Sequence, residues 1–209
     1  MKKKVYVVIF GDSIVSCSLL KQKKRWTEIL KKKFNKKYKN LFRLKTFSFN
    51  GATTNDAIVN FKKAKLNKKV NFIIFMFGIN DSVYWISKKG KPRVSLNIFK
   101  NNISKLVKKT NKHCDAKIAF MLAHKFFQNR FEGNKKTHNF NYQKYRNAII
   151  RISKLYKTKI IDMHSKLIPY PSRKYCLPLP DGLHLNNFGS LKYSQFIYKF
   201  IIKEAIRKS

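Results

Sequence analysis

Short apolar runs alternate along the chain with longer stretches in which apolar residues recur at helical spacing. The runs at 5–10, 70–77 and 117–123, the alternating stretch 43–49 and the short run 159–162 predict five β-strands. Helical spacing predicts helices over 19–38, from about 54 to 65, 96–107, 142–155 and 187–207, with loops at 80–94, 124–138 and 169–185. Strands that alternate with helices favour an α/β fold, a parallel sheet covered on both faces by helices.

The chain has the size of one domain. Its 209 residues contain no repeat, low-complexity linker or shift in composition, so we expect a single domain over residues 1–209. No apolar run approaches the roughly 20 residues of a membrane span, so no transmembrane segment is expected. Lys2-Lys3-Lys4 and the apolar run after it resemble the start of a signal peptide, but the run is short and Asp12 interrupts it. A cytoplasmic location is expected.

Cysteine use indicates neither a disulfide framework nor a metal site. Cys17, Cys114 and Cys176 are odd in number and stand at unrelated spacings. Cys17, although close to Ser13, is expected to be a small buried core residue. No metal and no cofactor is predicted.

The charge is strongly unbalanced, with 48 lysines and arginines against nine acidic residues and a formal net charge of +39. An A/T-rich coding sequence accounts for lysine over arginine, but it leaves the scarcity of acids unexplained. Such a charge attracts nucleic acid, anionic lipid surfaces and acidic substrates. The lysines are spread over segments such as 21–24, 31–33, 62–69 and 105–112, which is more typical of a solvated surface than of a nucleic-acid footprint.

Candidate chemistry begins at the end of the first predicted strand, where Gly11-Asp12-Ser13 follows an apolar run. Functional groups of parallel α/β sheets collect at the carboxyl ends of the strands, so Ser13 stands where a nucleophile is needed. Ester hydrolysis by serine also needs a base and a group that orients the base. His184 is the candidate base, and Asp181, three residues earlier, is the candidate orienting carboxylate.

Oxyanion donors have candidates at the ends of the next two strands. The backbone N–H groups of Ser13 and Gly51 and the side-chain amide of Asn80 are suited to this role, and Gly51 allows close approach of substrate because it has no side chain. At this point the chain resembles the SGNH (GDSL-type) hydrolases. The resemblance extends from residue 5 to about 200 and rests on four blocks in the family's order: Gly11-Asp12-Ser13, Gly51, Gly78-Ile79-Asn80-Asp81 and Asp181-Gly182-Leu183-His184.

The resemblance implies a three-layer α/β/α sandwich with a flavodoxin-like parallel sheet of five strands. It implies Ser13 as nucleophile and oxyanion donor, with the further donors and the triad partners at the positions already named. Asp12, Gly78 and Asp81 match motif positions, and we expect them to have structural roles: Asp12 in the nucleophile turn and Asp81 in capping the segment after the third strand.

The substrate pocket is expected to lie in the loops above the sheet. Tyr84, Trp85 and Phe126 are candidate walls for acyl chains or sugar rings. Lysines at 88, 89, 91 and 125 flank the same loops and would favour anionic substrates. The remaining histidines, at 113, 124, 138 and 164, are expected in loops or at the surface, although His124 could line the site.

The sequence therefore predicts a serine esterase: a lipase or acylesterase, a thioesterase or a carbohydrate O-deacetylase. The expected substrate is a small-molecule, lipid or sugar ester, with a negatively charged group on the substrate and nonspecific polyanion contact as two further possibilities. Two alternatives stay open. The same acyl-enzyme could be discharged to an acceptor other than water, giving an acyltransferase, or the fold could belong to a catalytically retired polyanion-binding protein.

Overall fold

Five parallel strands form one sheet in a computed structural model that describes residues 4–39, 41–85, 89–128 and 131–206. The strand order is β2-β1-β3-β4-β5, and every neighbouring pair is parallel. The bounds are β1 (Val5–Gly11), β2 (Phe42–Ser48), β3 (Val70–Met76), β4 (Lys117–Leu122) and β5 (Lys159–Asp162). The predicted α/β class and five-stranded parallel sheet are confirmed, with each strand end within one residue of its predicted position.

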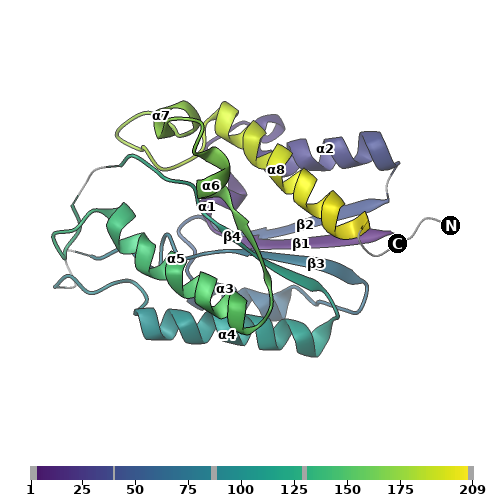
Figure 1. The fold of residues 1–209 in the computed structure, drawn as a ribbon, viewed down its shortest axis with the longest axis horizontal. Coiled ribbons are helices and arrows are strands. Elements are labelled where there is room, and N and C mark those ends of the chain that lie inside the picture. Colours follow the sequence, from purple (N-terminus) through teal and green to yellow (C-terminus); the bar gives the residue numbers. More distant parts are fainter. Residues whose placement is uncertain (1–3, 40, 86–88, 129–130, 207–209) are drawn as a thin grey trace.

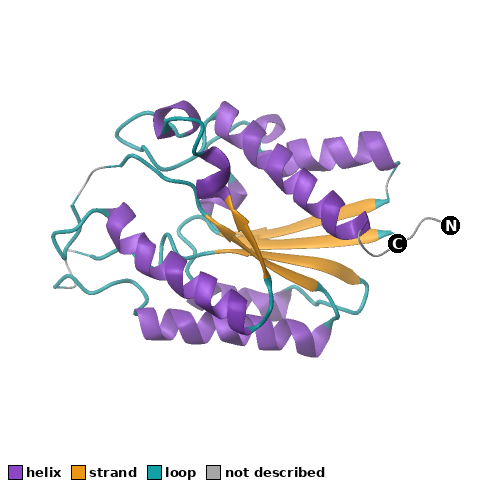
Figure 2. Ribbon diagram, in the orientation of Figure 1, coloured by secondary structure: helices purple, strands orange, loops and turns teal. Residues whose placement is uncertain are grey.

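Helices cover both faces of the sheet (Figures 1 and 2). One face carries the packed pair α2 (Trp26–Tyr38) and α8 (Asn187–Ile206). The other carries α3 (Thr54–Lys63), α4 (Leu96–His113) and α5 (His138–Leu155). The short elements are α1 (Ser13–Ser16), the 3-10 helix η1 (Gln22–Lys24), α6 (Met163–Leu167) and α7 (Ser172–Tyr175). The sandwich therefore has the three layers that the family resemblance implies.

The predicted helix over 19–38 is wrong in its first third, because α2 begins only at Trp26. Cys17 ends α1 in the left-handed conformation, with φ of 49°, and Arg25 is extended at the start of α2. Leu19, which the periodicity placed on a helix face, is 59% exposed, whereas Trp26 is fully buried. Helical spacing in this region counted an apolar residue that does not face the core.

Helix ends differ from the prediction where capping residues, rather than apolar spacing, decide them. α5 begins at His138, before the predicted start at 142, because the Thr137 side chain accepts a hydrogen bond from the Phe140 N–H and caps the helix. The short helices α6 and α7 lie in segments with no helix prediction. They contain at most five residues, too few to show helical spacing.

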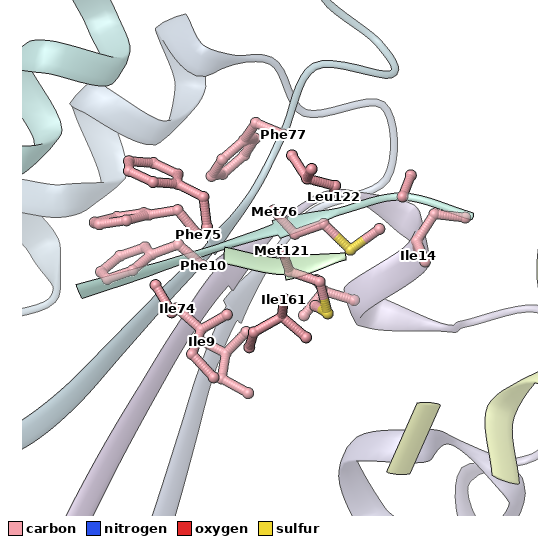
Figure 3. Close-up of a cluster of buried hydrophobic side chains, with 14 of the residues drawn as sticks. Ile9, Phe10, Ile14, Ile74, Phe75, Met76, Phe77, Met121, Leu122 and Ile161 are labelled. Carbon is pink, nitrogen blue, oxygen red and sulfur yellow. The ribbon is translucent and has the colours of Figure 1, made fainter. Parts of the chain in front are cut away.

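A ladder of phenylalanines runs across one face of the sheet. Phe10 lies opposite Phe47 and Phe75 in register, with ring centroids 5.1 and 5.3 Å away, and Phe75 lies 5.7 Å from Phe120. Figure 3 shows aliphatic side chains on the opposite side of the same strands: Ile9, Ile74, Met121 and Ile161. Both faces are therefore buried, and their packing fixes the strand ends rigidly.

The candidate residues follow three neighbouring strands. β1 lies between β2 and β3 in the sheet, and the three strands run in the same direction. Ser13, Gly51 and Asn80 follow the carboxyl ends of β1, β2 and β3, so the sheet order places them side by side.

Candidate active site

Ser13 is the first residue of α1 and is held by two buried side chains. Asp12 caps the helix, and its Oδ1 accepts a hydrogen bond of 2.9 Å from the Ile14 N–H. The Trp26 indole N–H donates to the Ile14 carbonyl oxygen at 2.8 Å. Asp12 is 1% exposed, and burial raises the pKa of its carboxyl to about 7, against the lowering effect of the Ile14 N–H. The nucleophile turn is therefore anchored in the core while Ser13 itself remains half-buried.

Ser13, His184 and Asp181 form a continuous chain of hydrogen bonds. Ser13 Oγ lies 2.9 Å from His184 Nε2, and His184 Nδ1 lies 2.7 Å from Asp181 Oδ2. Burial of the Asp181 carboxyl opposes its ionisation, but hydrogen bonds from the His184 and Leu183 N–H groups and the His184 ring outweigh burial and lower its pKa. An ionised Asp181 only accepts, so His184 Nδ1 carries the hydrogen and Nε2 is free to accept from the Ser13 hydroxyl.

Hydrogen bonds from Leu177 and His124 hold the segment that carries Asp181 and His184. The Leu177 N–H donates to the His184 carbonyl oxygen at 2.7 Å, which closes the segment onto itself. His124 Nε2 lies 2.9 Å from the Leu183 carbonyl oxygen and Nδ1 lies 2.7 Å from the Tyr193 hydroxyl. Burial lowers the pKa of His124 to about 4, so the neutral ring donates through Nε2 and accepts through Nδ1. His124 lies in the loop after β4, as one of the two predicted alternatives has it, but it is 1% exposed, so a surface position is excluded.

Ser13, Gly51 and Asn80 line one cleft and carry the three N–H groups proposed as oxyanion donors. The Asn80 side-chain amide donates one hydrogen to the Ala52 carbonyl oxygen at 3.0 Å, which fixes the amide and leaves its second N–H available. Within the part of the chain that the structure describes, the backbone N–H groups of Ser13 and Gly51 have no acceptor. Gly51 has φ of +72°, a left-handed conformation that favours glycine.

Asp81 ties the Asn80 turn to the start of α3. It is fully buried; its Oδ1 accepts from the Thr54 N–H at 2.9 Å and hydroxyl at 2.6 Å, and its Oδ2 accepts from the Gly78 N–H at 3.1 Å. Burial raises the pKa of Asp81 to about 6, against the lowering effect of these hydrogen bonds. The carboxylate therefore sets the distance between Asn80 and the segment that contains Gly51.

The five central candidates line one cleft of about 380 Å³. Its lining joins Ser13, Gly51, Asn80, Asp181 and His184 to seven residues that the sequence did not single out as pocket residues: Ser18, Leu19, Asn50, Val83, Gln128, His138 and Leu183. A second hollow of about 410 Å³ lies between α2 and β2, beside Phe34 and Arg43, and contains none of the reactive side chains.

His138 is the main cleft residue that sequence reasoning missed. It was expected at the surface, but it is 1% exposed, and its Nε2 lies 2.9 Å from the carbonyl oxygen of Ile79, just before Asn80. Its Nδ1 lies 3.9 Å from Glu132 Oε1, while Glu132 Oε2 accepts from the Tyr84 N–H at 3.0 Å. His138 thus supports the peptide that carries Asn80. Its place next to the Thr137 helix cap was the only local signal.

The three residues predicted as pocket walls differ in how far their side chains are exposed. Trp85 is 42% exposed and Tyr84 is partly buried. The chain lines the cleft at Val83, just before them, but neither Tyr84 nor Trp85 is a lining residue, so these two predictions are wrong for this cleft. The prediction of Phe126 as a wall is wrong: it is 1% exposed and packs beneath the cleft, with its ring centroid 5.0 Å from that of His138.

The lysines predicted to flank the pocket loops are exposed where the structure describes them. Lys89, Lys91 and Lys125 are exposed, and Lys88 lies outside the described residues.

The three cysteines are buried and unpaired with one another, as expected for Cys17. No group of three potential metal ligands occurs among the residues described, and no helix there is long and apolar enough to cross a membrane.

Comparison with known proteins gives one family. Residues 9–190 match the GDSL-like lipase/acylhydrolase family. The uncharacterized lipoprotein YqeF of Bacillus subtilis is 33% identical over 147 residues, which are 68% of this chain and 56% of that protein, so the chain spans little more than half of that relative's length.

Two solved structures have a similar fold. The acetyl xylan esterase AlAXEase has a TM-score of 0.77 at 15% identity, covering 94% of this chain and all of that chain. The esterase EstA of Pseudoalteromonas sp. has a TM-score of 0.72 at 17% identity, covering 96% and 98%. The chain therefore belongs to the GDSL-like lipase/acylhydrolase family.

Proposed function

We propose that this chain hydrolyses carboxylic esters through an acyl-enzyme on Ser13. The observation that carries the proposal is the hydrogen-bonded chain from Ser13 Oγ through His184 to Asp181, which opens into a cleft with available N–H donors. Two of its distances, 2.9 and 2.7 Å, are those of good hydrogen bonds, so the base is in contact with the nucleophile before substrate arrives.

In the first half-reaction the Ser13 oxygen attacks the ester carbonyl carbon while His184 Nε2 takes the hydroxyl proton. The carbonyl oxygen becomes an oxyanion, which accepts hydrogen bonds from the Ser13 and Gly51 N–H groups and from the Asn80 amide. Asp181 stabilises the imidazolium that forms. His184 then gives its proton to the departing alcohol oxygen as the carbon–oxygen bond breaks, and the acyl group stays on Ser13.

In the second half-reaction water takes the place of the alcohol. His184 removes a proton from the water as its oxygen attacks the acyl carbon, and the same donors hold the second oxyanion. Collapse of this intermediate releases the acid and returns the proton to Ser13. An acceptor alcohol in place of water would give the acyltransferase alternative with the same residues.

The substrate class rests on the cleft and its rim. A cleft of about 380 Å³ fits a short acyl group or one sugar ring better than a long chain. The acetyl xylan esterase and esterase with similar folds are consistent with short acyl esters, although at 15–17% identity they support only the fold. We propose short-chain or carbohydrate acyl esters as substrates. The expected cytoplasmic location stays a prediction.

The test is labelling with a fluorophosphonate, combined with hydrolysis of p-nitrophenyl acetate. A phosphonate is known to inhibit the structurally similar EstA. Wild type should be labelled and active, and Ser13→Ala should lose both. Ser18→Ala is the matched control, because Ser18 is a hydroxyl in the same cleft that hydrogen-bonds Asn50 rather than histidine. It should retain labelling.

The outcome separates the function classes. Absence of Ser13-dependent labelling and hydrolysis in folded protein would reject the esterase and favour the polyanion-binding alternative. Product analysis in the presence of an added alcohol, such as glycerol, distinguishes transfer from hydrolysis, because a transferase forms the new ester in preference to free acid.

A further inference from the structure

Arg93 brings a guanidinium group to the rim of the candidate active site. A Cβ atom built on Gly51 would lie 3.9 Å from Arg93 Nη1, and apart from Gly51 and its two chain neighbours no other heavy atom of the described residues lies within 4 Å of it. Gly51 lines the cleft together with Ser13 and Asn80. Since the glycine has no side chain, the space between its backbone and the guanidinium is open to a substrate.

The Arg93 backbone is fixed by the turn that supports Asn80. Its N–H donates to the Val83 carbonyl oxygen at 2.9 Å, and the following N–H, of Val94, donates to the Asp81 carbonyl oxygen at 3.2 Å. The guanidinium lies over the Trp85 ring, 5.7 Å from its centroid. Stacking on an aromatic face leaves the N–H groups at the edge of the guanidinium plane free to donate.

No carboxylate neutralises Arg93 within the described ranges. Its guanidinium forms no ion pair and no hydrogen bond there, whereas Arg146 lies 2.6 Å from Asp162. The acids closest to the site are already engaged: Asp81 by Thr54 and Gly78, and Asp181 by His184 and Leu183. The scarcity of acids thus leaves a fixed cation beside the oxyanion donors without a counter-ion.

We propose that Arg93 determines specificity by binding an anionic group of the substrate, a carboxylate or a phosphate, next to the scissile ester. The inference rests on the proposed esterase function and names its substrate class. The planar guanidinium offers paired N–H donors that match both anions, which the flexible ammonium groups of Lys89 and Lys91 do not. A charged hydrogen bond at this position lowers the free energy of the bound anionic ester and has no counterpart with a neutral one.

The experiment compares charged and neutral esters of the same shape. On the alcohol side the probes are 4-acetoxybenzoate, 4-acetoxyphenyl phosphate and methyl 4-acetoxybenzoate. On the acyl side they are the 4-nitrophenyl monoester of terephthalic acid and its methyl ester. The quantity measured is the ratio of kcat/KM for the anionic ester to kcat/KM for the neutral one, so that comparison between variants cancels the intrinsic reactivity of each ester.

Arg93→Gln removes the cation and should lower this ratio about tenfold or more for at least one pair, while Arg93→Lys should retain part of it. The carboxylate and phosphate arms show which anion is preferred. Arg43→Gln is the matched control. It also removes one arginine stacked on an aromatic ring, 5.9 Å from the Tyr6 centroid, but on β2 at the end remote from the cleft.

An equal fall in both arginine variants would mean that net charge, rather than Arg93, attracts the anion, and would overturn the proposal. Repeating the series at high salt sharpens this comparison, because screening removes the diffuse attraction first. A wild-type ratio unaffected by Arg93→Gln and Arg93→Lys would also overturn it. If instead no ester of either kind, anionic or neutral, is hydrolysed in a Ser13-dependent way, the proposed function fails rather than this inference.

Discussion

Gly11, the first residue of the Gly-Asp-Ser motif, is expected to control the position of Ser13 through a single close contact. An alanine Cβ at this position would lie 2.2 Å from Val15 Cγ2, 2.8 Å from Val15 Cβ and 3.2 Å from the Met76 carbonyl oxygen. Val15 belongs to α1, whose first residue is Ser13, and is 1% exposed. Gly11→Ala therefore pushes the nucleophile helix away from β1.

The size of the displacement follows from the contacts. Ordinary contact between two carbon atoms begins at about 3.5 Å, so the 2.2 Å approach requires a shift of about 1 Å. The Ser13 Oγ–His184 Nε2 distance of 2.9 Å leaves no room for such a shift within hydrogen-bond range. A misplacement of about 1 Å can cost about 100-fold in rate. Overpacking of this kind costs about 1–3 kcal/mol of unfolding free energy.

The assay is kcat/KM on p-nitrophenyl acetate, corrected for the folded fraction measured by circular dichroism. Gly11→Ala should fall about 100-fold. The exchange Gly11→Ala with Val15→Gly removes both short carbon contacts and should recover most of that loss, with Val15→Gly alone as control for the cost of glycine in α1. Wild-type activity in Gly11→Ala, or no recovery in the double variant, would refute the reasoning.

Three further predictions concern charge and hydrogen bonding at the site. Asp181→Asn should lower kcat about 10⁴-fold in steady-state assays, because an amide that donates to His184 selects the wrong tautomer; a loss under tenfold would contradict this. Asp12→Asn should gain stability relative to wild type as pH rises from about 4 to about 7, by up to about 1.4 kcal/mol per pH unit in urea unfolding. The sign follows from the raised pKa. Because the native carboxyl holds its proton more tightly than the unfolded one, wild type loses stability as pH rises from the unfolded pKa to the folded pKa. Parallel curves of unfolding free energy against pH for the two proteins would argue against it. His138→Phe should lower kcat about tenfold with little change in KM, because Ile79 loses its partner and the neighbouring Asn80 donor shifts; an unchanged kcat would exclude this support.

Local sequence predicted the strands well because their signal is strong and short-ranged. β1, β3 and β4 are largely buried and read as continuous apolar runs, whereas β2 at the sheet edge reads as an alternating stretch. All five strands agree with the prediction within one residue at each end. Helix starts were harder. Trp26 and His138 begin helices at positions set by the backbone conformation of Arg25 and by the Thr137 cap, which apolar spacing does not report.

Histidines show where single-residue expectations fail. His124 and His138 were expected in loops or at the surface, yet both are buried and bind the backbone carbonyl oxygens of Leu183 and Ile79. A buried histidine needs hydrogen-bond partners, and the carbonyl oxygen that each of these rings binds comes from a segment 59 residues away in sequence. Phe126 was misplaced for the same reason, since the long-range neighbours that bury it do not appear in its own segment.

The sequence by itself determined the candidate reactive groups. Four short motifs at strand ends and in the last loop contain the serine, the histidine, the aspartate and the three proposed oxyanion donors, and the topology of a parallel sheet brings strand ends together. Only the tertiary structure decided how these groups are held and what else faces them. Contacts between distant segments place Arg93 beside Gly51, remove Phe126 from the cleft and leave the guanidinium without a counter-ion among the residues that the structure describes. Such contacts depend on packing across the whole fold, and local patterns do not encode them.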